Sequence, residues 1–96
     1  MRRALAAVIG VASIAAAVVA SAEPPAGAAA CSGCHPASTR VTSPVPRLAG
    51  LDRAMIVRAM QDFRSGQRAS TVMDRIAKGF TEAEIQAIAA WYATQR

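Results

Sequence analysis

The sequence predicts a small, single-domain, all-α protein. Two segments, 52–65 and 81–94, place apolar side chains at the i, i+3, i+4, i+7 spacing of one helix face. The apolar positions are Ile56, Ala59, Met60 and Phe63 in the first segment, and Ile85, Ile88, Ala89 and Tyr92 in the second. After residue 22 no alternating apolar and polar run predicts a strand, and the 96 residues suffice for one domain.

Residue composition, N-capping residues and helix-ending glycines predict where each helix and loop begins and ends. Alanines over 26–34 favour a short helix, and the prolines of segment 36–50 predict an irregular loop. Three further helices are expected, over about 52–65, 73–78 and 81–94. Asp52 is a suitable N-cap and Gly66 a suitable stop for the first of these. Gly79 stops the second, and Thr81 with Glu84 forms a capping box that opens the third.

The motif Cys31-Ser-Gly-Cys34-His35 carries the strongest functional signal. Two thiols three positions apart, followed at once by an imidazole, form the attachment signature of a c-type haem. One helical turn lets both thiols reach the vinyl groups of one porphyrin edge, and the next side chain faces the iron. We therefore predict one covalent haem c, with Cys31 and Cys34 as thioether anchors and His35 as the proximal iron ligand.

Two other interpretations of the cysteine pair are a redox disulfide and half of a zinc site. A redox C-x-x-C motif belongs on a βαβ scaffold, and no strands are predicted here. Zinc would need more nitrogen or sulfur ligands than one histidine and two cysteines provide. A haem-free thiol or metal protein is thus the alternative from another class.

The second axial ligand is expected to be a methionine, because His35 is the only histidine. Met1 would leave with the leader, and Met55 and Met60 fall in a predicted helix. Met73 follows a polar, non-periodic segment that can deliver it to the iron face opposite His35. We predict Met73 as the distal ligand, with Met55 and Met60 as alternatives. His/Met ligation fills both axial positions, which favours single-electron transfer over catalysis.

The first 22 residues predict a secretory signal peptide. Arg2 and Arg3 precede an uncharged apolar run, and Ala20-Ser21-Ala22 fits a cleavage site. The mature domain would be 23–96, periplasmic and without a membrane span. An uncleaved membrane anchor is the alternative, although the run is rich in alanine and poor in large apolar side chains.

Composition limits the mature chain further. Its 74 residues carry nine basic and six acidic side chains, without a basic stripe interleaved with aromatics, so no nucleic-acid partner is expected. A chain this short usually needs a further stabilising element, such as a disulfide or a bound metal, in addition to its apolar core. We therefore expect the haem to supply much of the core, and the haem-free chain to be largely disordered.

In the order of its motifs the chain resembles a small class I cytochrome c. The segments that carry the resemblance are C-x-x-C-H, Val45-Pro-Arg-Leu-Ala-Gly50, Phe63-Arg-Ser-Gly66-Gln-Arg68, Met73 and the final Trp91-Tyr92. The stretch 71–85 resembles, more specifically, the haem subunit of flavocytochrome c sulfide dehydrogenase.

The resemblance implies roles for further residues. The carbonyl of Pro46 would accept a hydrogen bond from His35 Nδ1, and Leu48 would pack near the haem. Arg47 or Arg68 would pair with a haem propionate. The first and last helices would cross, with Gly27 or a nearby alanine approaching Trp91 or Tyr92.

The resemblance also implies partners. An FAD-containing dehydrogenase subunit would oxidise sulfide and pass electrons singly to this chain, which would hand them to another periplasmic cytochrome. Catalysis would lie on the partner, so the chain by itself would not be an enzyme. A free periplasmic electron shuttle for another oxidase or reductase is the alternative.

Overall fold

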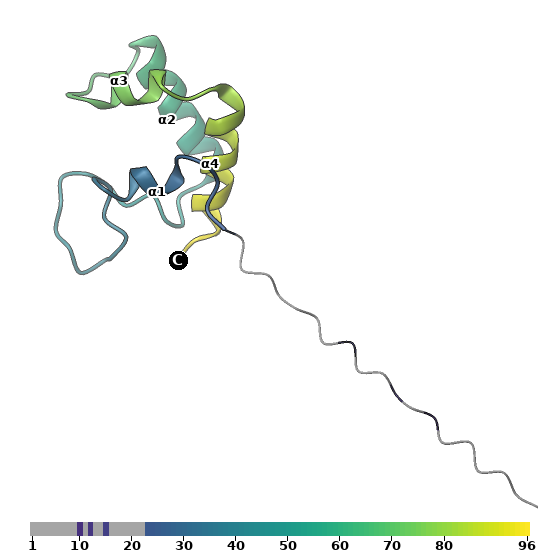
Figure 1. The fold of residues 1–96 in the computed structure, drawn as a ribbon. Coiled ribbons are helices and arrows are strands. Elements are labelled where there is room, and N and C mark those ends of the chain that lie inside the picture. The colour runs from purple at the N-terminus through teal and green to yellow at the C-terminus, as the bar shows by residue number, and fades with distance from the viewer. Residues whose placement is uncertain (1–9, 11, 13–14, 16–22) are drawn as a thin grey trace, which may run out of the picture.

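The computed structural model describes residues 10, 12, 15 and 23–96, and four helices lie within these residues. They are α1 (Ala28–Cys31), α2 (Arg53–Ser65), α3 (Met73–Lys78) and α4 (Glu82–Thr94) (Figure 1). Within the described ranges there is no strand, so the all-α prediction is confirmed. The predicted signal peptide, apart from residues 10, 12 and 15, lies outside the described residues.

The bounds of α2 follow from local capping, as predicted. The Asp52 carboxylate accepts a hydrogen bond from the Met55 backbone N–H at 3.2 Å. Gly66 ends the helix with φ +79°, and its N–H donates to the Phe63 carbonyl at 3.4 Å. A glycine in this left-handed conformation is a common way for a helix to stop.

The capping box of α4 is fully formed. Thr81 Oγ1 accepts from the Glu84 N–H at 3.1 Å, and the Thr81 N–H donates to Glu84 Oε1 at 3.0 Å. These two hydrogen bonds satisfy amide donors that a helix start otherwise leaves without partners. The helix ends at Thr94, where the sequence predicted it.

The first helix is shorter than the predicted 26–34. Gly27 has φ +87°, which is incompatible with a right-handed helix, so α1 cannot begin before Ala28. After Cys31 the backbone tightens, because Gly33 N–H donates to Ala30 and Cys34 N–H to Cys31, each three residues back at 3.2 Å. The helix therefore continues into a tight turn rather than a further regular turn.

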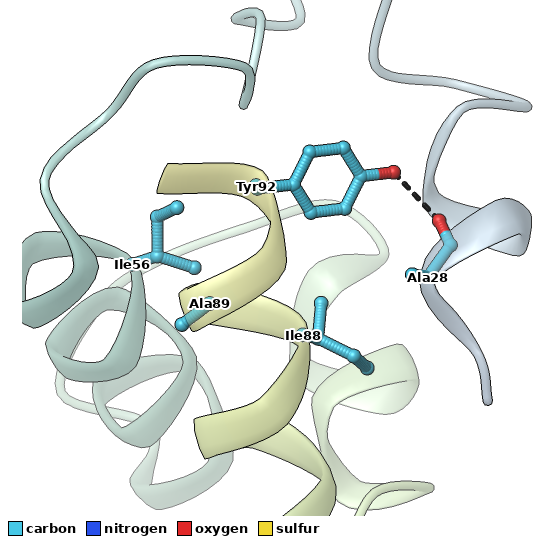
Figure 2. Packing of buried hydrophobic residues seen from close by; sticks show 5 residues of the cluster. All are labelled: Ala28, Ile56, Ile88, Ala89 and Tyr92. Carbon is cyan, nitrogen blue, oxygen red and sulfur yellow. Dashed lines mark hydrogen bonds between the residues drawn. The ribbon is translucent and has the colours of Figure 1, made fainter. Parts of the chain in front are cut away.

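Helix α4 is the centre of the core. It packs against α2 and α1, and α2 also packs against α3. The predicted apolar face of α4 is buried, whereas in α2 only Ile56 is buried. The cluster comprises Ala28, Ile56, Ile88, Ala89 and Tyr92, and Figure 2 shows the Tyr92 hydroxyl reaching across to α1.

Two residues allow α1 to approach α4 closely. A Cβ at Gly27 would lie 2.5 Å from Phe80 Cε1 and 3.4 Å from Ile88 Cδ1. The neighbouring Ala28 is fully buried, and its carbonyl accepts a hydrogen bond from the Tyr92 hydroxyl at 2.6 Å. The implied crossing of the first and last helices is thus present, with Gly27 facing Phe80 and Ile88 and Ala28 facing Tyr92.

The apolar core is thin for a folded domain. Ile85 is the only large side chain of the described residues with less than 2% of its surface exposed. Val41, Met55, Val72 and Ile76 are large, apolar and exposed, at 56%, 59%, 47% and 39%. No helix in the described part of the chain is long and apolar enough to cross a membrane.

Candidate functional site

The cysteine–histidine motif is wound as one compact turn at the carboxyl end of α1. Cys31 is the last residue of the helix, and its carbonyl accepts from the N–H groups of both Cys34 (3.2 Å) and His35 (2.9 Å). Both thiols and the imidazole therefore project from a single turn of backbone. This is the local geometry that the sequence motif predicts.

Neither cysteine is in a disulfide. Cys31 is half-buried and its Sγ lies 3.6 Å from the Gly27 carbonyl oxygen, whereas Cys34 is exposed. Burial raises the pKa of the Cys31 thiol, although hydrogen bonds from its surroundings, including one with Tyr92, act in the opposite direction. A raised pKa keeps this thiol protonated at neutral pH, which is the opposite of an activated redox cysteine.

His35 has a defined tautomer. Its Nδ1 lies 2.6 Å from the carbonyl oxygen of Pro46. Because a carbonyl oxygen can only accept, Nδ1 must carry the proton, so in the neutral imidazole the lone pair lies on Nε2. A neutral imidazole held in this way presents Nε2 as a metal ligand. This hydrogen bond is the one that the resemblance implied for Pro46.

A cavity of about 320 Å³ lies beside His35. Leu48, Pro36, Trp91 and Tyr92 contribute to its wall, so Leu48 does lie in the neighbourhood of the imidazole. Neither cysteine lines it, and nor does Met73. The cavity is therefore a hollow next to His35 and does not link the two predicted axial ligands.

Met73 is the first residue of α3 and is half-buried. The start of α3 is held by Ser70, whose Oγ accepts from the Asp74 N–H at 2.9 Å. Helix α3 packs on α2 and makes no packing contact with α1. The structure thus orders both predicted ligand-bearing elements without bringing them together, and the pairing of His35 with Met73 stays a prediction.

The two arginines considered as propionate partners make other contacts. Arg47 Nε donates to the Ala37 carbonyl at 3.0 Å, and the Arg68 guanidinium carbon lies 4.9 Å from the centre of the Phe63 ring. Sequence reasoning missed the Arg47 bond and the bond from Tyr92 to Ala28. The second had a signal, because a tyrosine on a buried helix face needs a partner for its hydroxyl.

The zinc alternative has no support from side-chain placement. Among the described residues, no group of three or more His, Cys, Asp or Glu side chains is assembled to hold a metal ion. A structural zinc site needs four such ligands in a tetrahedron.

Comparison with known proteins gives the relatives of the chain. No family model matches it. It is 42% identical over 62 residues to the cytochrome subunit of sulfide dehydrogenase of Chlorobaculum tepidum, covering 65% of this chain and 56% of that protein. It is 37% identical over 62 residues to cytochrome c-552 of Acidithiobacillus ferridurans, covering 65% and 27%. It is 38% identical over 65 residues to the thiosulfate dehydrogenase electron acceptor of Stutzerimonas stutzeri, covering 66% and 30%.

The chain spans about half the length of the first of these relatives and less than a third of the other two. Residues 23–96 are all-α in this structure, and their first helix ends in the C-x-x-C-H turn described above. By sequence the chain is similar to these bacterial cytochromes, and the four-helix arrangement of its described residues is consistent with a small, all-α class I cytochrome c.

Proposed function

We propose that this chain is a periplasmic, monohaem c-type cytochrome that transfers single electrons. The observation that carries the proposal is the turn at 31–35, in which two thiols outside any disulfide precede an imidazole whose Nδ1 is already bonded to Pro46. That bond leaves Nε2 as the free nitrogen. A backbone acceptor on the non-ligating nitrogen is typical of histidines that bind metals.

The residues present fit a covalently attached haem. The thiols of Cys31 and Cys34 would form the thioethers, His35 Nε2 would hold the iron on one face, and Met73 on the other. When bound, the haem supplies a one-electron Fe(III)/Fe(II) couple. Pro46 would fix the imidazole ring, and Leu48 would contribute apolar surface beside it.

The thin core supports the same assignment. Large apolar side chains stay exposed on the loop after the motif and around α3. An apolar cofactor held between α1 and α3 would cover such surface and would join two helices that otherwise share no packing contact.

We infer a sulfur-compound dehydrogenase as the electron donor. Two relatives are named as a subunit of sulfide dehydrogenase and as an electron acceptor of thiosulfate dehydrogenase. An FAD-containing sulfide dehydrogenase subunit is the donor we propose, with another periplasmic cytochrome as the acceptor. Catalysis would then belong to the donor. A free shuttle is the second candidate, supported by the relative that is named only as an electron acceptor.

Purification of the native protein tests the proposal. The exported chain should show the absorption spectrum of low-spin haem c, and its mass should exceed that of residues 23–96 by one haem. An FAD protein that co-elutes in equal amount supports the subunit role, whereas a monomeric cytochrome under gentle conditions supports the shuttle. A colourless protein at its apoprotein mass would refute the haem assignment.

The distal ligand has its own test. Met73→Ala should abolish the low-spin spectrum and lower the reduction potential, because thioether ligation favours Fe(II). Met55→Ala is the matched control, since Met55 is 59% exposed and its loss opens no core cavity. If Met73→Ala keeps the parent spectrum and Met55→Ala or Met60→Ala loses it, the ligand has been misassigned.

A further inference from the structure

We propose that Arg47 is a positioning residue for the iron ligand: its Nε–H bond to Ala37 holds the Pro46 carbonyl against His35. The proposal rests on the proposed function for its consequence at the iron, but its geometry concerns this chain alone. Arg47 follows Pro46 directly, and Ala37 lies two residues after His35. The side chain thus ties together the two backbone segments that carry the imidazole and its acceptor.

Two hydrogen bonds close the neck of the long loop. His35 Nδ1 bonds to the Pro46 carbonyl at 2.6 Å, and Arg47 Nε bonds to the Ala37 carbonyl at 3.0 Å. The two bonds point in opposite directions across the base of the loop. Segment 35–37 supplies the His35 donor and the Ala37 acceptor, and segment 46–47 supplies the Arg47 donor and the Pro46 acceptor. The hydrogen bonds inside the loop are local, from Arg40 N–H to Ser38 and from Val45 N–H to Ser43.

The backbone at Pro46 needs such a tie. Proline has no N–H, so it cannot donate a backbone hydrogen bond to anchor its own peptide unit. Pro46 is also exposed, which leaves little packing to hold it. The next long-range anchor along the chain is the Gly50 N–H, which donates to the Tyr92 carbonyl at 3.0 Å. Arg47 supplies, from its side chain, a donor next to the residue that lacks one.

The tie acts on the imidazole through Pro46. A close carbonyl fixes the ring orientation and makes Nε2 a more basic ligand. If the tie is lost, Pro46 can move away from His35 and the Nδ1 proton becomes accessible to water. A less basic imidazole stabilises Fe(III) less, so the reduction potential should rise. If Arg47 served only as a positive charge, any replacement that keeps the charge would be silent.

The test compares Arg47→Lys with Arg40→Lys in the purified full-length protein. Lysine keeps the charge at position 47 but has no N–H at the place of Nε. Arg40 lies in the same loop, is exposed, and its guanidinium makes no hydrogen bond or ion pair within the described residues. The first readout is the exchange rate of the His35 Nδ1 proton with solvent, measured by NMR. The second is the reduction potential.

We expect Arg47→Lys to speed this proton exchange about fivefold, the worth of a typical hydrogen bond, and to raise the potential. Arg40→Lys should change neither, and amide exchange in α4 should be equal in all three proteins. Equal Nδ1 exchange in Arg47→Lys and the parent would overturn the proposal, as would an equal effect of both replacements.

Failure of the proposed function looks different. A colourless parent protein removes the haem, yet the exchange measurement still reads the imidazole itself. In that protein, slow Nδ1 exchange that is accelerated only by Arg47→Lys upholds the tie. Exchange in the parent as fast as that of free imidazole overturns it.

Discussion

The hydroxyl of Tyr92 illustrates how much one atom contributes in a small core. It donates to the Ala28 carbonyl at 2.6 Å, across 64 positions of sequence (Figure 2). Burial raises the pKa of this hydroxyl, and the neighbouring Cys31 raises it further. The group therefore stays protonated, and able to donate, throughout the physiological range. The bond ties α1, and with it the C-x-x-C-H motif, to α4.

Tyr92→Phe should destabilise the protein by about 1–3 kcal/mol, because the buried Ala28 carbonyl loses its partner. Thr94→Val is the matched control, since it removes an exposed hydroxyl that bonds to the Trp91 carbonyl on the same helix. That change should stay within about 0.5 kcal/mol. Urea unfolding of the haem-containing proteins measures both. If both variants lose the same free energy of unfolding, the Tyr92 hydrogen bond stabilises the protein no more than an exposed one does.

Residues of the site differ in how far the sequence could predict them. Cys31, Cys34 and His35 follow from spacing alone, because their geometry is local to one turn. The role of Pro46 could be predicted only from the family resemblance, and the structure does contain the hydrogen bond between its carbonyl and His35. The tie from Arg47 to Ala37 spans ten positions inside an irregular loop, where no periodicity constrains side chains. The role of Met73 depends on tertiary placement and stays a prediction.

The helix bounds also divide into those that the local sequence determines and those that tertiary contacts determine. The sequence predicted α2, α3 and α4 well because the N-caps of α2 and α4, and the glycines that follow α2 and α3, are encoded within a few residues of the helix ends. It overestimated α1, because the conformation of Gly27 is set by tertiary contact. The Phe80 ring occupies the place of a Cβ there, which no local pattern reports.

Gly27→Ala should therefore cost more stability than Gly66→Ala. Both glycines have positive φ, +87° and +79°, so an alanine pays a similar backbone cost of about 1–2 kcal/mol at each. At Gly66 the new Cβ meets open space, whereas at Gly27 it would lie 2.5 Å from the Phe80 ring. Overpacking should add about 1–3 kcal/mol at Gly27. Urea midpoints compare the two variants, and equal losses would mean that Phe80 moves aside freely.

The capping box gives α4 a dependence on pH. Hydrogen bonds from the Thr81 backbone and side chain lower the pKa of Glu84. A lowered folded-state pKa means that the stabilisation is complete above the ordinary glutamate pKa of about 4.3 and is lost as pH falls through the lowered value.

Glu84→Gln checks this dependence, because glutamine preserves the hydrogen-bond acceptor without the charge. The parent should be more stable than the variant at pH 6, and the gap should close toward pH 3. Urea midpoints measured across this range give the gap directly. If the stability difference between the parent and Glu84→Gln does not change with pH, the charge of Glu84 is not its cause.

For the whole molecule, the central question is what completes the core. Among the described residues its fully buried members are three alanines and Ile85, while side chains such as Leu48, Met60 and Trp91 are only partly buried against the cluster. Ordering each residue costs about 1.5 kcal/mol, which a core of this composition does not easily offset in so short a chain. The two long helices, α2 and α4, have side-chain N-caps, and Gly27 allows α1 to approach α4, so what the chain lacks is apolar surface.

Removing the attachment chemistry tests this interpretation. Cys31→Ala with Cys34→Ala should give an exported, colourless chain with little helical circular dichroism and no cooperative thermal transition, because neither covalent attachment nor the cofactor surface remains. The single variant Cys34→Ala is the informative partner, since Cys34 is exposed and contributes no packing. It should retain haem through one thioether, with a lower but still cooperative melting transition. Native-like helicity and a cooperative melt in the haem-free double variant would show that the polypeptide core suffices by itself, and the cofactor would then be cargo rather than part of the fold.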